Sequence, residues 1–281
     1  MRLLVINPNT SASVSALLQA RLQVVCPAHV AFEVVTARLG APYIASESSF
    51  AVAGHAALDA WAAATHGADA EPEREFDAVL IGCFGDPGLF ALRECSAAPV
   101  TGLAEAAFRQ AAARGPFAIV TGGAAWAPML RRHAQVTGHA DLLVGIHTVE
   151  ATGAALAADR ALAQAVLSEA CLAAARGPGV QSIIVGGAGL AGMAAWLQPH
   201  VPLPLIDSVD AGLAEAMAMA AKAAAAAIAD TAAAAAAAAV GTERVAMPTA
   251  TDGHPARAAV AAAHWTGVSV ELARWATSQR A

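Results

Sequence analysis

The residues best placed to do chemistry surround a single cysteine. Cys83 follows Asp77–Ile81, a short apolar run typical of a buried strand, and precedes Leu89–Glu94, which begins a helix. Asp86 is placed to cap that helix, with Pro87 in its first turn. Backbone N–H groups and the helix dipole at such a turn favour an anion, so one interpretation is a thiol of lowered pKa acting as base or nucleophile. The alternative is a small apolar side chain packed in a tight turn.

Polar or glycine-rich residues also follow other predicted strands. Asn7 and Asn9 come after the first apolar run, where they either bind a carboxylate or ureide or simply shape the loop, and Thr10 or Ser11 caps the next helix. Further along, Thr121 and the following glycines either donate hydrogen bonds to a developing enolate oxygen or form an ordinary strand-to-helix turn.

Elements that could position these loops alternate along the chain. Apolar, β-branched runs alternate with Ala/Leu-rich helical runs, which is typical of a parallel α/β architecture. The predicted strands lie at 3–6, 31–36, 77–81, 117–121, 142–147 and 181–185, and the predicted helices include 51–64 and 154–175.

An internal duplication divides the chain. Val185–Leu190 aligns without gaps on Ile81–Asp86, and the repeat has a period near 105 residues. We therefore predict two pseudo-equivalent parallel α/β lobes with the active cleft between them, because ligands bind at the carboxyl ends of parallel strands. The predicted division is 1–100 with 206–240, 101–205, and a tail at 241–281. The tail contains a linker at 241–255 and a short helix, which Trp265 and Trp275 dock on a neighbour or on the body.

Composition limits the classes of function. The 281 residues carry a net charge of −6, so there is no basic footprint for nucleic acid. No run of bulky apolar residues is long enough to predict a membrane span, because the long run after Ala218 is nearly pure alanine. Four scattered cysteines without a metal-ligand spacing predict no metal site and suit a reducing cytoplasm.

Three segments together resemble a known family. Ile6–Ser11, Ile81–Leu89 and Gly102–Ala106 look like motifs of the aspartate/glutamate/hydantoin racemase superfamily, nearest its hydantoin and allantoin racemase branch. The similarity covers residues 1–217 in motif order and leaves the tail without a counterpart.

The resemblance implies a cofactor-independent racemase that uses two cysteines on opposite faces of a small-molecule substrate, and a homo-oligomer. Inversion requires an acid and a base on opposite faces in one turnover. The first family cysteine maps onto Cys83, flanked by Gly82 and Phe84. The second maps onto Gly187, before Ala188, so the second thiol is absent.

Several substitutes and reactions stay open. His147 is the best titratable replacement for the missing thiol, and Glu47, Asp207 or a bound water are others. The chain could be a racemase or isomerase, a one-cysteine decarboxylase of malonate-type acids, or a degenerate ligand-binding paralogue. The predicted substrate site comprises Asn7, Asn9, Thr10, Glu47, Gly82, Phe84, Thr121, Gly122, Gly187 and Ala188.

A rival motif overlaps the second turn. Gly187–Gly192 reads GxGxxG after a strand, with Asp207 about twenty residues on, as in dinucleotide-binding folds. Three prolines soon after it, at 199, 202 and 204, interrupt the helix that such a site needs. We therefore favour the racemase-like interpretation and expect no cofactor.

Overall fold

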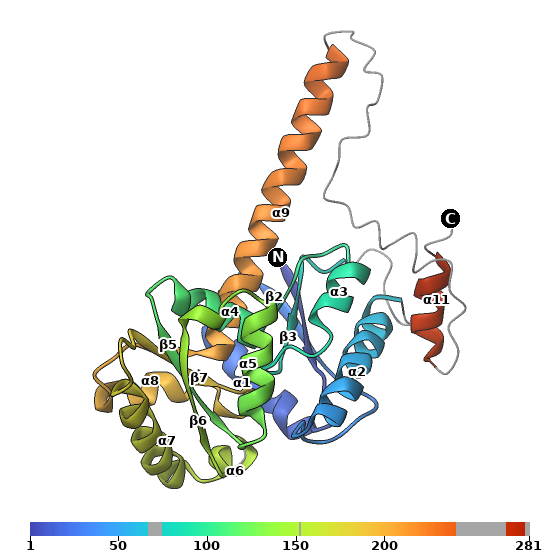
Figure 1. Cartoon of the computed structure of the whole chain (residues 1–281). Coiled ribbons are helices and arrows are strands. Elements are labelled where there is room, and N and C mark those ends of the chain that lie inside the picture. The colour runs from blue at the N-terminus through green and yellow to red at the C-terminus, as the bar shows by residue number, and fades with distance from the viewer. Residues whose placement is uncertain (67–74, 152, 240–267, 279–281) are drawn as a thin grey trace.

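The computed structural model describes residues 1–66, 75–151, 153–239 and 268–278. Two four-stranded parallel sheets form its two lobes (Figure 1). The strands are β1 (Arg2–Asn7), β2 (Ala31–Thr36), β3 (Ala78–Ile81), β4 (Val100–Gly102), β5 (Phe117–Gly122), β6 (Leu143–Val149), β7 (Ser182–Gly186) and β8 (Leu205–Asp207). The helices are α1 (Ala12–Val25), α2 (Glu47–His66), α3 (Leu89–Cys95), α4 (Leu103–Ala112), α5 (Trp126–Val136), α6 (Gly153–Ala158), α7 (Arg160–Ala175), α8 (Met193–Leu197), α9 (Ser208–Ala239) and α11 (Val270–Ser278).

Both sheets have the same strand order. The first lobe is built on β2-β1-β3-β4 and the second on β6-β5-β7-β8, so each lobe repeats one topology. The central strands β1, β3, β5 and β7 are almost entirely buried. Parallel sheets are covered by helices on both faces, which is why these strands read as continuous apolar runs. The predicted α/β class and the two parallel lobes are confirmed.

Two short strands were not among those predicted. β4 pairs with β3, and β8 pairs with β7. The predicted lobe boundaries at 100/101 and 205/206 fall inside these two strands, so the chain leaves each sheet a few residues later. The predicted helix 154–175 is also divided, because Asp159 is non-helical and accepts a hydrogen bond from the N–H of Leu162 at the start of α7.

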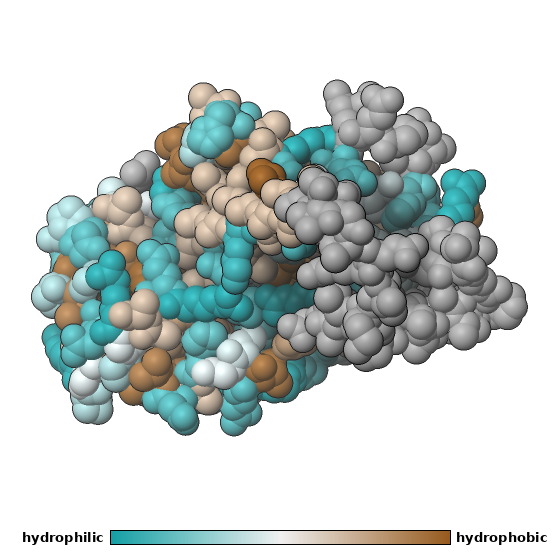
Figure 2. Space-filling model, turned by 90° about the horizontal axis from the view of Figure 1, so that it is seen from above, coloured by the Kyte–Doolittle hydropathy of each residue, from teal (hydrophilic) through white to brown (hydrophobic). Residues whose placement is uncertain are grey.

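Helix α9 leaves the body of the protein. Its first turns pack against α4 and β3, whereas residues 221–235 are all exposed, and the helix projects beyond both lobes (Figure 1). Seen from above, pale brown residues gather where α9 points toward the viewer, with teal hydrophilic residues beside them (Figure 2). Alanine favours helix intrinsically, so this sequence forms a helix even where little is buried.

The segment Ser208–Ala235 of α9 is long and apolar enough to cross a membrane by length and composition, with a mean hydropathy of 1.3. Our expectation of no membrane span rests instead on side-chain chemistry. Alanine transfers weakly into lipid, and Lys222 and Asp230 interrupt the exposed part.

The C-terminal helix α11 packs against α2. Trp275 is 2% exposed and meets Trp61 edge-to-face, with ring centroids 5.4 Å apart. Of the two predicted places for Trp275, a neighbour or the body, the structure shows the body. Trp265 and the predicted linker 241–255 lie outside the described residues.

Candidate active site

A cavity of about 200 Å³ lies between the lobes, at the carboxyl ends of their central strands. Its walls are largely apolar and come from the turns after β1, β3, β5 and β7, together with the loop that precedes α2. Eight of the predicted site residues line it: Asn9, Gly82, Cys83, Phe84, Thr121, Gly122, Gly187 and Ala188. The common strand order explains this convergence, because equivalent loops of the two lobes face a shared space.

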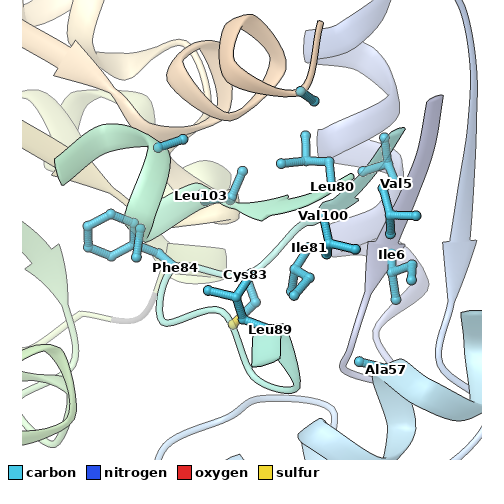
Figure 3. Close-up of a cluster of buried hydrophobic side chains, with 14 of the residues drawn as sticks. Val5, Ile6, Ala57, Leu80, Ile81, Cys83, Phe84, Leu89, Val100 and Leu103 are labelled. Atoms are coloured by element: carbon cyan, nitrogen blue, oxygen red, sulfur yellow. The ribbon is translucent and has the colours of Figure 1, made fainter. Parts of the chain in front are cut away.

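Cys83 lies two residues after the end of β3 and is 8% exposed. Its side chain sits beside Leu89 at the end of the apolar cluster (Figure 3). Burial raises the pKa of the Cys83 thiol above its ordinary value, and the negative charge of Asp86 raises it further. The expectation of a lowered pKa is therefore wrong for the unliganded protein, since removal of water disfavours a thiolate more than this turn stabilises it.

The sequence predicts that Asp86 caps α3, and this prediction is wrong. The Asp86 carboxylate instead accepts hydrogen bonds from the N–H groups of Ala104 (2.9 Å) and Glu105 (2.8 Å), in the first turn of α4. The residue before α3 is Gly88, and its backbone is left-handed. His133 of α5 lies 2.8 Å from the same carboxylate through Nε2. Asp86 thus ties the Cys83 turn to α4 and to a helix of the second lobe.

The turn after β7 faces the cavity without any ionisable side chain. The Phe84 ring crosses from the first lobe to Gly186, where a Cβ would lie 2.2 Å from the ring. Gly187 has a φ of 133°, and the nearest side-chain atom to a Cβ built there is 3.8 Å away. Space for a side chain therefore exists at Gly187, but the backbone favours glycine.

Thr121 does not offer its hydroxyl proton to the cavity. That hydroxyl donates to the backbone oxygen of Gly186 at 2.8 Å, which joins β5 to β7. The predicted role of donor to an enolate oxygen is not available to Thr121 in this geometry.

Of the two predicted asparagines, Asn9 lines the cavity and Asn7 does not. Asn7 is fully buried, and its Nδ2 donates to the Ser11 oxygen and to Ser15 Oγ, so it shapes the loop after β1. Asn9 lines the cavity and is 7% exposed. Thr10, in contrast, is absent from the lining and holds the loop through its N–H, which donates to Ala41.

The predicted substitutes for the second thiol lie elsewhere. His147 lines a separate groove beside Glu150 and α7. Glu47 is exposed and pairs with Arg132, and it does not line the cavity. Asp207 is buried and accepts hydrogen bonds from the N–H groups of Gly192, Val209 and Asp210, outside the cavity lining. Burial raises its pKa to about 6.

Two aromatic residues of the cavity were missed by the sequence reasoning. Tyr43 and Trp126 both line it. Their side chains meet at Gly123, where a Cβ would lie 2.7 Å from the Tyr43 hydroxyl and 3.5 Å from Trp126 Cδ1. Tyr43 is the chain's single tyrosine and lies four residues before Glu47, a predicted site residue, and these two facts were the signal available.

The GxGxxG motif does not form a dinucleotide site. Ala188–Leu190 is one turn of 3₁₀ helix, and α8, which follows, is five residues long. The Rossmann fingerprint requires its glycine turn to open a crossover helix of normal length, whose N-terminus binds the phosphates. Within the ranges described above, no group of three or more His, Cys, Asp or Glu residues could hold a metal ion.

These features define a two-lobed α/β protein with a cysteine in a cavity between its duplicated sheets. Residues 3–216 match the family model described as Asp/Glu/Hydantoin racemase. The chain therefore belongs to this family.

Individual relatives show the same relationship. The hydantoin racemase of Paenarthrobacter aurescens is 31% identical over 224 residues, covering 78% of this chain and 91% of the relative. The allantoin racemase structure from Klebsiella pneumoniae is 31% identical with a TM-score of 0.72, covering 79% of this chain and 88% of that one. An arylmalonate decarboxylase structure shares the fold, at 16% identity and a TM-score of 0.52, over 78% of this chain and 92% of its own.

Proposed function

We propose that the protein is a cofactor-independent racemase or isomerase that moves a proton at the carbon α to a carbonyl, with Cys83 as acid and base. Its substrate is an amino acid, a hydantoin or a related ureide. The observation that carries the proposal is the position of Cys83, buried at the end of β3 in a small cavity walled by both lobes. The named activities of the relatives support the same substrate class.

The environment of Cys83 suits proton abstraction from carbon. A thiolate without water around it is a stronger base than a solvated one, because its pKa is higher. The cost is a smaller thiolate fraction before substrate binds. A substrate that seals the cavity would exclude water from the enolate as well, which strengthens every hydrogen bond to it.

A one-cysteine decarboxylase of malonate-type acids is the second candidate. The observation that favours it is that Cys83 is the single cysteine of the cavity lining, with Gly187 in the turn of the other lobe. Decarboxylation of a malonate needs one proton delivered to the resulting enediolate, so a single thiol suffices.

Activity of matched cysteine variants distinguishes these reactions. Optical rotation of single enantiomers of allantoin and of the hydantoins derived from alanine and phenylalanine measures racemisation, and release of CO₂ from substituted malonates measures decarboxylation. Cys83→Ser should lower the active reaction by about 10²–10⁴-fold, the usual contribution of an acid/base group. Cys171→Ser, the same change at a fully buried cysteine outside the cavity, should retain activity. Unchanged turnover in Cys83→Ser would overturn the proposal.

A further inference from the structure

The second ionisable side chain of the cavity is a phenol. Tyr43 is half-buried on the loop between β2 and α2, which belongs to the first lobe. Its hydroxyl reaches the second lobe, where it donates a long hydrogen bond of 3.5 Å to the backbone oxygen of Gly122 and lies against Gly123. Tyr43 therefore belongs to the first lobe and contacts the second lobe beside the cavity that it lines.

Elimination among the lining residues leaves few groups that exchange protons. The other side chains of the lining are apolar, amide or hydroxyl groups, so Cys83 and Tyr43 are its two titratable members. The Thr121 hydroxyl donates to the Gly186 oxygen at 2.8 Å, whereas the Tyr43 hydroxyl donates to the Gly122 oxygen across a longer and weaker 3.5 Å. No side chain at Gly187 can return a proton.

We propose that Tyr43 is the second proton-transfer group, so that Cys83 and Tyr43 together form the acid/base pair of this cavity. This inference rests on the proposed function and names the group that would do the work of the missing thiol. It assigns the two proton transfers to two loops of the same lobe, with the phenol held by contacts to the opposite lobe.

The electrostatics of the cavity suit such a pair. Burial raises the pKa of the Tyr43 phenol, a hydrogen bond from Trp126 acts against that shift, and the charge of ionised Cys83 raises it again. A negative charge on one of two neighbouring acids disfavours ionisation of the other. The pair therefore carries one negative charge more readily than two. When Cys83 is a thiolate, Tyr43 thus keeps its proton, which gives one base and one acid in the same cavity.

The proton transfers balance within the pair. The Cys83 thiolate takes the α-proton, the Cα–H bond breaks, and its electron pair moves to the carbonyl oxygen as an enolate. The Tyr43 O–H then donates its proton to the same carbon, the enolate collapses to the carbonyl, and a phenolate remains. That Cys83-thiol, Tyr43-phenolate form is the one that processes the opposite enantiomer, and exchange with water restores the first form.

The test is Tyr43→Phe, which removes one oxygen and keeps the ring. Each enantiomer of allantoin and of the hydantoins derived from alanine and phenylalanine is incubated separately in D₂O. Deuterium at the α-carbon and optical rotation are both followed. The variant should lose inversion by about 10²-fold or more. It should still exchange deuterium, with retention, in the one enantiomer that presents its proton to Cys83, and leave the other inert.

The outcomes separate the two claims. Inversion of both enantiomers at the wild-type rate by Tyr43→Phe would overturn the role of Tyr43 while leaving that of Cys83 intact. An equal loss of exchange from both enantiomers would overturn it too, since a residue that only shapes the cavity has no preferred enantiomer. No exchange by the wild-type protein on any of these substrates would overturn the proposed function and this inference together. Thermal unfolding of the variant checks that its fold is retained.

Discussion

Replacing Asp86 with Asn should destabilise the protein far more than the small chemical change suggests. Asp86 is 2% exposed, and its two carboxylate oxygens serve three donors: two N–H groups of α4 and His133 Nε2. Its φ is 54°, a left-handed conformation that Asn tolerates as well as Asp does, so the backbone adds no new strain. The variant therefore reports on the carboxylate alone.

The expected loss follows from these contacts. Asn keeps one acceptor oxygen and turns an NH₂ group toward the remaining donors, so at least one charge-assisted hydrogen bond is lost, worth about 1.5–3 kcal/mol. A buried N–H is also left without a partner, so the total loss is about 2–4 kcal/mol. Urea-induced unfolding followed by circular dichroism measures it, with the m-value showing whether the transition is unchanged.

Asp159 provides the matched control. It is exposed and accepts a single N–H, that of Leu162, at the start of α7. Asn and Asp are equivalent at such a position, so Asp159→Asn should change the free energy of unfolding by no more than about 0.5 kcal/mol. A loss of unfolding free energy below about 1 kcal/mol for Asp86→Asn, at an unchanged m-value, would refute the conclusion that the Asp86 carboxylate links the Cys83 turn to α4 and α5.

Two further substitutions test separate parts of the account. Asp207 has a pKa raised from an ordinary 3.8 to about 6, so the folded protein binds the Asp207 proton more tightly than the unfolded chain does. The stabilisation from Asp207 is therefore fully present below pH 4 and is lost as pH rises through about 6. That loss is about 3 kcal/mol in the wild type, and it should disappear in Asp207→Asn; equal pH slopes in urea unfolding would contradict this. Gly187→Ala should cost about 1–3 kcal/mol although a Cβ has room, because φ is 133°, and a neutral change in thermal unfolding would show that the backbone relaxes freely.

The sequence predicts strands well where a long apolar run marks them. The strands that lie in the middle of each sheet are buried on both faces, so their apolar runs are continuous and easily recognised. The three-residue strands β4 and β8 carry too few residues for a pattern, and only pairing with β3 and β7 defines them. The shared topology of the lobes followed from the repeat around Cys83 and Gly187.

The site was harder to predict, because its members depend on contacts distant in sequence. Asp86 was assigned to the helix that follows it, whereas it binds α4, eighteen residues later along the chain. His147 has the right chemistry and ends the predicted strand 142–147, but in the structure it lies inside β6 and lines another groove. Tyr43 is the chain's single tyrosine, but only its contact with Gly122 of the second lobe places it at the cavity. Burial, which decides the pKa of Cys83, is likewise a property of the assembled lobes.

Exchange of the α-proton with solvent tests the central claim most directly, because it needs neither inversion nor loss of CO₂ to be seen. Each enantiomer of allantoin and of the alanine and phenylalanine hydantoins is incubated in D₂O, with wild-type protein or with Cys83→Ser, and the α-proton is followed by NMR. We predict deuterium incorporation by the wild type and its loss in Cys83→Ser from the enantiomer that presents its α-proton to Cys83, with Cys171→Ser behaving as wild type. Equal incorporation by wild type and Cys83→Ser would contradict the account.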